Sequence, residues 1–216
     1  GFGMGNYRDT LMEQLANNGD GNNYYIDSQA QAQRVFVEQM GATIFTIARD
    51  VKLQVAFSDD AVAAYRLIGY ENRDIADRDF RNDRVDAGEV GSGHTVTALY
   101  EVILKEDYDD TLASVHLRYE APGADKAAAE IAFPFPDDAL SETEALASKD
   151  ARIAYAAATF AEILRESPHT SELSLDTLIR YTKDAQRPGG DDAELIRLMR
   201  TAQQLGAGAG SGVASR

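Results

Sequence analysis

The spacing of apolar residues changes twice along this chain, and those two changes limit the folds it can adopt. Near the N-terminus and over the last third, apolar residues recur every three or four positions, which is the period of a helix. Between Lys52 and about Pro136 they alternate with polar residues, which is the period of a strand. The chain is therefore expected to be an α+β protein in three parts, 1–51, 52–136 and 137–206, followed by a flexible tail, 207–216.

The first part predicts a helix, a turn, a strand and a second helix. Residues 9–17 have a helical apolar face, and the following 17–23, NNGDGNN, are typical of a turn. Residues 24–27, YYID, predict a short strand. Ser28 can then cap a long helix that we expect to run to Val51.

The middle part predicts five strands. Alternation is clearest at 53–57, 115–119 and 131–135, and the runs 63–72 and 95–104 are also rich in strand-forming residues. Five strands separated by turns indicate an antiparallel β-sandwich or a small barrel. The link 73–94 has no regular period.

The last part predicts three helices packed on that sandwich. The first follows a capping-box spacing at Ser141 and Glu144, the second begins at Ser174, and the third follows Asp191 and Glu194. Gly206 is placed to end the third helix. Five of its residues are expected to face inward: Leu195, Leu198, Met199, Ala202 and Leu205.

Composition excludes several classes of site. The net charge of −15 disfavours binding to nucleic acid or to anionic lipid, because both are themselves negatively charged. The absence of cysteine excludes disulfides, thiolate metal sites and a cysteine nucleophile in these 216 residues. No run of about 18 apolar residues could form a membrane span.

The glycines at positions 1, 3 and 5 resemble a phosphate-binding loop, but the residues that follow do not complete one. A Walker loop needs Lys and Ser or Thr after its last glycine, and Asn6, Tyr7 and Arg8 stand there instead. A loop after a strand is the expected reading. The turn at 17–23 likewise lacks the glutamate of a calcium loop, since Gln29 occupies that position.

The link 73–94 holds the best candidates for metal binding or acid–base chemistry. Carboxylates and one imidazole could serve either purpose, and they are Asp77, Asp79, Asp83, Asp86, Glu89 and His94. Four arginines in the same link favour a solvated, ion-paired loop instead. A hydrolase triad is not expected, because His116 lies on the polar face of a strand, His169 follows Pro168, and the sequence has no nucleophile elbow.

The order of these segments resembles one bacterial family. The segment GFGMGNYRDTLMEQLANNGDGNNYYIDS resembles the end of the von Willebrand factor type A domain of YfbK-like proteins. DVKLQVAF, YRLIGYENR, DFRNDRVDAGEVGSGHTVTALYEV and the 172–205 region resemble the C-terminal domain that follows it there. The resemblance implies that residues 1–51 are the remnant of a doubly wound α/β sheet, so we expect the sequence to be part of a longer protein.

The resemblance also implies where a cofactor would bind. The family's metal-ion-dependent adhesion site opens with Asp-x-Ser-x-Ser, and this chain has no such motif. Catalytic, cofactor-binding and metal-ligating residues are therefore all expected to be absent here. Mg²⁺ or Mn²⁺ is expected only in a complete A domain, upstream of Gly1.

The resemblance implies a non-catalytic protein-interaction or adhesion module at the bacterial cell envelope. We expect a protein partner, self-association through the exposed A-domain remnant, and neither nucleic-acid binding nor membrane insertion by this chain. One alternative is an adaptor subunit for an AAA+ ATPase. A more remote alternative is a small hydrolase that uses the Asp83–His94 region.

Overall fold

The computed structural model describes residues 2–3, 8–19, 21, 23–38, 40–69, 75–85, 87–106, 111–123, 128–135, 140, 143, 147–170, 173–188 and 191–207. The chain divides into two compact units built from interleaved segments. Unit 1 comprises Gly1–Ala63, Arg73–Val96 and Leu104–Asp137, and unit 2 comprises Ala64–Asn72, Thr97–Ile103 and Asp138–Arg216. Domain limits at residues 51 and 136 do not anticipate this interleaving, and they stay a prediction.

Unit 1 begins with a strand, a helix and a parallel strand. Strand β1 (Phe2–Gly3) pairs with β2 (Tyr24–Tyr25) in parallel, with Phe2 opposite Tyr24. Parallel neighbours need a crossover connection, and helix α1 (Asp9–Asn18) supplies it. The expected strands at the glycines and at YYID are therefore both present, although each is only two residues long. Gly1, Gly5, Asn6 and Tyr7 lie outside the described residues.

The long helix expected from Ser28 to Val51 is wrong in its second half. Ser28 does cap α2 (Gln29–Gln33), accepting a hydrogen bond from the Gln31 backbone N–H at 3.2 Å. A π-helical turn (Arg34–Glu38) and helix α3 (Met40–Ile44) follow, and strand β3 (Thr46–Phe57) begins immediately afterwards.

The apolar period misled because it fits both structures between residues 44 and 51. Ile47 and Val51 are β-branched residues that suit a strand as well as a helix. Pairing of β3 with two neighbouring strands decides the outcome. Asp50 also has a φ of +47°, which a right-handed helix cannot contain.

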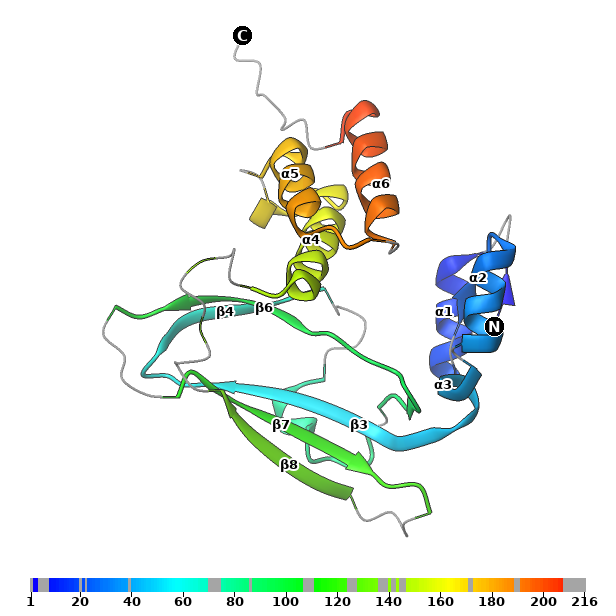
Figure 1. The fold of residues 1–216 in the computed structure, drawn as a ribbon. Helices are drawn as coiled ribbons and strands as arrows, with labels where there is room; N and C mark the ends of the chain where they lie inside the picture. The colour runs from blue at the N-terminus through cyan, green and yellow to red at the C-terminus, as the bar shows by residue number, and fades with distance from the viewer. Residues whose placement is uncertain are drawn as a thin grey trace. The chain divides into compact units, whose positions relative to one another are not determined.

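Four strands of unit 1 form one sheet, in the order β5, β3, β7 and β8 (Figure 1). β5 is Val90–Gly91, β7 is Ala113–Glu120 and β8 is Ala128–Phe135. Every pairing in this sheet is antiparallel. The other two expected strands are β4 (Val62–Ile68) and β6 (Leu99–Leu104), which form a separate two-stranded sheet. The five expected strands are therefore confirmed, while the sandwich stays a prediction.

The register of β3, β7 and β8 sorts their side chains into two faces. Successive rows across the three strands alternate between wholly apolar and largely polar residues. The apolar rows are Leu53–Leu117–Ile131, Val55–Val115–Phe133 and Phe57–Ala113–Phe135. The rows between them are Lys52–Arg118–Glu130, Gln54–His116–Ala132 and Ala56–Ser114–Pro134.

The proline in β8 stands where it costs no ladder hydrogen bond. The Ser58 N–H donates to the Leu112 carbonyl at 2.9 Å, which directs the even-numbered backbone groups of β7 toward β3. In the pairing with β8, Pro134 consequently directs its backbone away from β7, toward the open edge of the sheet. An edge proline of this kind hinders the addition of another strand.

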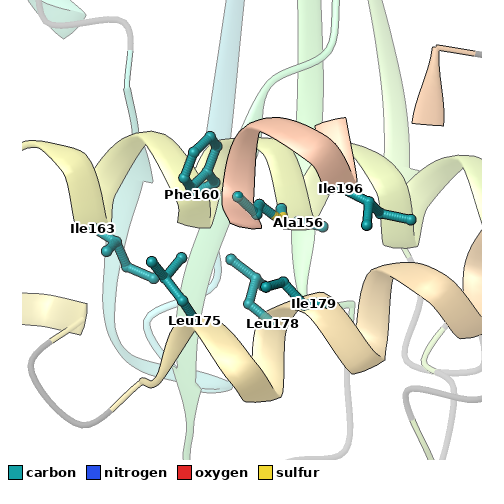
Figure 2. Close-up of a cluster of buried hydrophobic side chains, with 8 residues drawn as sticks. Ala156, Phe160, Ile163, Leu175, Leu178, Ile179 and Ile196 are labelled. Carbon is teal, nitrogen blue, oxygen red and sulfur yellow. The ribbon is translucent and has the colours of Figure 1, made fainter. Parts of the chain in front are cut away.

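Unit 2 contains the best-packed core of the described chain, formed by helices α4 (Lys149–Leu164), α5 (Leu175–Ala185) and α6 (Asp192–Gln204). Figure 2 shows side chains of α4 and α5 pointing toward one another, with Ile196 of α6 beside them. The buried members are Ala156, Phe160, Ile163, Leu175, Leu178, Ile179, Ile196 and Met199.

The ends of these helices agree only in part with the sequence prediction. Ser174 caps α5, and the Gly206 N–H and the Ala207 N–H return to the carbonyls of Gln203 and Ala202 to end α6 in a Schellman motif. Asp191 precedes α6 but makes no side-chain capping bond. α4 is capped by Ser148, whereas Ser141 and Glu144 lie outside the described residues.

Two of the five residues expected to face inward on α6 are exposed. Met199 is fully buried, but Leu198 is 49% exposed and Leu205 is 82% exposed. Leu205 lies at the C-cap, where the Schellman turn carries the chain away from the helix. Asp192 takes an inward position instead, because its carboxylate pairs with the Arg187 guanidinium at 2.7 Å.

Truncating the core of unit 2 will cost far more stability than truncating its surface. We expect Leu178→Ala to lower the free energy of unfolding by about 2–5 kcal/mol, because it removes a buried side chain and leaves a cavity. Leu198→Ala is the matched control and should cost less than about 1 kcal/mol, since its side chain is half exposed. Urea unfolding followed by circular dichroism measures both. Equal losses would contradict the assignment of this core.

Candidate functional site

The polar face of the three-stranded region is covered by a segment that we call the polar strap, residues 77–85. It begins with a 3₁₀ turn, Asp77–Asp79. The strap contacts all three strands. On β3, the Gln54 side-chain amide donates to Asp77 Oδ1 at 3.0 Å and the Lys52 ammonium donates to the Asn82 carbonyl at 3.1 Å. The polar side chains of β3 thus hold both ends of the strap.

Ion pairs attach the strap to the other two strands. The Arg81 guanidinium donates two bonds to the Glu130 carboxylate on β8, at 2.9 and 2.6 Å. Arg118 on β7 donates to Asp83 Oδ1 at 2.5 Å. His116 Nδ1 lies 3.4 Å from Glu130 Oε1, so the imidazole joins the same cluster.

One aromatic ring anchors the strap among these charges. Phe80 is only 3% exposed, and its ring meets the His116 ring edge to face at 6.4 Å between centroids. The Arg81 guanidinium lies over the same ring, 5.5 Å from its centroid. Phe80 is therefore the apolar centre of an otherwise polar attachment.

Beside the strap, β3 carries an irregularity that buries a charge pair. The register with β7 shifts between Arg49 and Lys52, and Asp50 adopts its left-handed backbone conformation there. The Lys52 side chain is almost fully buried, and its ammonium donates to Asp50 Oδ2 at 2.9 Å. A left-handed residue at a bulge re-aims its side chain, and here it brings the carboxylate to Lys52.

These pairs lower the pKa of two carboxyl groups. The hydrogen bond from Arg118 lowers the pKa of Asp83, and the hydrogen bonds from Arg81 lower the pKa of Glu130. Because the folded pKa values lie below the unfolded ones, both pairs stabilise the attached strap above about pH 4. That stabilisation is lost as the pH falls through the folded pKa values.

The structure separates the acidic candidates of the link 73–94. Asp77, Asp83 and Glu89 each contact a different strand residue, respectively Gln54, Arg118 and Thr46. Asp79 accepts a bond from Asn82, and Asp86 lies outside the described residues. Within the described part of the chain, no three His, Asp or Glu side chains are grouped so that they could hold a metal ion.

His94 does not join Asp83 in a catalytic pair. Its side chain is exposed, while its backbone N–H donates to the Gly91 carbonyl at 3.0 Å. His116 lies on the polar face as expected, and His169 lies in a 3₁₀ turn, Pro168–Thr170. The ion-paired interpretation of the link is confirmed, although its charges pair mainly with the sheet.

Sequence reasoning missed the residues that receive the strap. Lys52, Arg118 and Glu130 were visible only as polar members of alternating strands, and Asp50 fell inside the expected helix. The polar alternation could have indicated a covered face, because Lys52 and Arg118 stand at equivalent positions in strands expected to pair. The left-handed Asp50 had no sequence signal.

Unit 2 contains a small apolar hollow. Its volume is about 270 Å³, and it is lined by Ile68, Gly69, Thr97, Leu99, Ala154, Ala158, Ala161 and Arg165. A buried ion cluster lies on the same helix, where Glu162 accepts bonds from Arg66 at 3.1 Å and from Ser167 at 2.8 Å. These contacts satisfy the carboxylate, so the arrangement is typical of a structural ion cluster.

A second surface feature of unit 1 lies near its N-terminus. Seven large apolar side chains there are between 46% and 67% exposed. We call them the N-terminal apolar surface: Leu11, Leu15, Val37, Met40, Ile44, Phe45 and Ile47. Single exposed apolar residues are ordinary, but seven within 37 positions of sequence are typical of a surface that another element covers. As to the membrane, the described residues contain no helix with the length and apolarity of a membrane span.

Comparison with known proteins places these features in a family. A family model described as "Uncharacterized protein YfbK, C-terminal" matches residues 42–110 and again 104–205. "Uncharacterized protein YfbK" of Escherichia coli (strain K12) is 33% identical over 223 aligned residues, which cover 94% of this chain. The alignment covers 38% of that relative, so this chain spans well under half of its length. No solved structure matches the chain.

The attachment of the strap can be tested through the titration of Asp83. In the unaltered protein we expect the Asp83 carboxyl to titrate below the usual range, because Arg118 donates to its ionised form. Arg118→Gln should return the pKa toward about 3.9. Carboxyl ¹³C NMR against pH measures the shift. Arg197→Gln, which removes an exposed pair on α6, is the control and should leave Asp83 unaffected. An unchanged Asp83 pKa in Arg118→Gln would show that the pair does not form.

Proposed function

Because the chain belongs to the YfbK C-terminal family, we propose that it is a non-catalytic protein-interaction or adhesion module. In this proposal it forms the C-terminal part of a von Willebrand factor type A domain protein of the bacterial cell envelope. The A-domain assignment and the envelope location rest on the sequence resemblance. The N-terminal apolar surface carries the interaction role.

The N-terminal apolar surface supports binding to another polypeptide. Val37, Ile44 and Phe45 each expose more than 60% of their side chains. Fully burying one such side chain stabilises an assembly by about 1.5–3 kcal/mol, before the entropic cost of association. Several together provide the apolar centre that protein interfaces require. The binding role follows from this exposed area.

Two observations support an A-domain origin for the same segment. The family model begins at residue 42, so most of the N-terminal apolar surface precedes it. Phe2–Gly3 and Tyr24–Tyr25 form a parallel pair joined through helix α1. A strand–helix–strand unit with parallel strands is the building block of doubly wound sheets. We therefore propose that residues 1–41 complete such a sheet with residues outside this chain.

The non-catalytic assignment is supported by how the candidate residues are used. Asp77, Asp83 and Glu89 accept hydrogen bonds that attach the link to the sheet. Catalytic carboxylates usually combine a perturbed pKa with access to a substrate cavity. Asp83 has a lowered pKa, but its partner Arg118 explains that shift structurally.

The donor set of this chain does not fit the family's divalent-metal site. That site takes hydroxyl and carboxylate oxygens from an Asp-x-Ser-x-Ser loop, and the sequence contains no such loop. The described residues offer no cluster in its place. We propose that Mg²⁺ or Mn²⁺, where the complete protein uses one, binds to residues outside this chain.

Site-specific photo-crosslinking tests the interaction role. A photoreactive residue at position 37 should yield a discrete adduct with one partner protein, or with a second copy, when it is introduced into the protein in its native host. The same residue at position 205 is the control, since Leu205 is 82% exposed but lies on α6. No adduct, or equal adducts at both positions, would contradict the proposal. An adduct with an AAA+ ATPase would support the adaptor alternative.

Self-association of the chain should depend on the same surface. We expect Val37→Ser combined with Phe45→Ser to lower the weight-average mass at high concentration, because both side chains are mostly exposed and apolar. Leu205→Ser should leave that mass unchanged. Sedimentation equilibrium measures it, and circular dichroism checks that folding is retained. A monomeric unaltered chain would refute self-association, while the crosslinking experiment would still test a different partner.

A further inference from the structure

Two buried polar atoms beside the polar strap have no hydrogen-bond partner. They are Asp50 Oδ1, which can only accept while ionised, and Arg118 Nε, which can only donate. Lys52 links them in space, because its ammonium bonds the other oxygen of Asp50 and its backbone stands opposite Arg118 in the register. An unpaired acceptor and an unpaired donor therefore share one small region of the polar face.

Other contacts hold both atoms in place. Asp50 is fixed by its left-handed backbone and by the bond from Lys52 to Oδ2. Arg118 is fixed by the bond from its Nη2 to Asp83 on the strap. Leaving a buried polar group unpaired is costly, so folded proteins supply a partner or an internal water.

The surrounding charges select what could bind between them. Positive groups are supplied by Lys52 and Arg118, and negative groups by Asp50 and Asp83. An anion would meet two carboxylates, and a metal cation would meet an ammonium and a guanidinium. A neutral molecule that both donates and accepts has neither conflict. Water is the smallest such molecule.

We propose that one internal water accepts a hydrogen bond from Arg118 Nε–H and donates one to Asp50 Oδ1. It completes the hydrogen bonding of the bulge in β3. It also ties the strap to the sheet, because Arg118 and Lys52 bind Asp83 and Asn82 of the strap. This inference is independent of the interaction role proposed above.

A crystal structure of the protein at about 1.5 Å resolution tests the proposal directly. We expect one ordered water whose oxygen lies about 2.7–3.2 Å from both Asp50 Oδ1 and Arg118 Nε. A direct hydrogen bond between the two side chains would overturn the inference. So would an absence of density between two unpaired atoms, or the density of an ion.

Solution NMR provides a second test that does not require crystals. A bound water that stays for longer than the tumbling time gives a cross-relaxation peak with the Arg118 Nε–H whose sign differs from that of mobile surface water. We expect this peak for Arg118 but not for the exposed Arg197, which serves as the internal control. An Arg118 signal like that of Arg197 would overturn the proposal.

Two variants separate the water from general burial. Asp50→Asn retains a side-chain oxygen and tolerates the left-handed backbone, so the cross-relaxation peak should persist. Asp50→Ala removes the acceptor, so the peak should be lost. If Asp50→Ala does not fold, Asp50→Ser, which keeps a shorter hydroxyl, should weaken the peak relative to Asp50→Asn. A peak of undiminished intensity in a folded Asp50→Ala or Asp50→Ser variant would show that Asp50 does not hold the water.

Discussion

The pairing register of β3, β7 and β8 is the constraint on which the rest of unit 1 depends. A strand exposes alternate side chains on opposite faces, so a shift by one residue would exchange the two faces completely. The observed register gathers the apolar rows on one face and places Lys52, Arg118 and Glu130 together on the other. Each strap contact follows from that alignment, because its partners come from three different strands.

The polar face is closed by charge pairs, and this has a cost and a consequence. Exposed ion pairs contribute little stability, so Phe80 supplies the apolar burial that the charges do not. Partly exposed pairs are also weakened by salt and by acid. The strap is therefore expected to detach under milder conditions than the helical core of unit 2. There the buried Asp192 keeps a lowered pKa through its bonds from Arg187, in the connection between α5 and α6.

Much of this fold could be predicted from local pattern, and the errors have physical causes. The strands, the cap at Ser174 and the helix end at Gly206 follow from period and turn chemistry, and all are present. Residues 46–51 were misassigned because pairing with distant strands decides a segment whose local pattern suits two structures. The site was harder to predict, since Arg118–Asp83 and Arg81–Glu130 join residues 35 and 49 positions apart. The A-domain origin of residues 1–41 came from resemblance and not from any periodicity.

The most direct test of this account is the register itself, measured by Hα–Hα nuclear Overhauser effects across β3 and β7. The Ser58–Leu112 bond makes Val55–Val115 and Leu53–Leu117 non-hydrogen-bonded pairs, in which the Cα atoms approach to about 4.5 Å. The account predicts strong Hα–Hα contacts for both pairs. Contacts from Leu53 to His116 or to Arg118 instead would mean a register shifted by one residue. That shift would turn the apolar residues of β7 toward the strap and contradict the description of both faces.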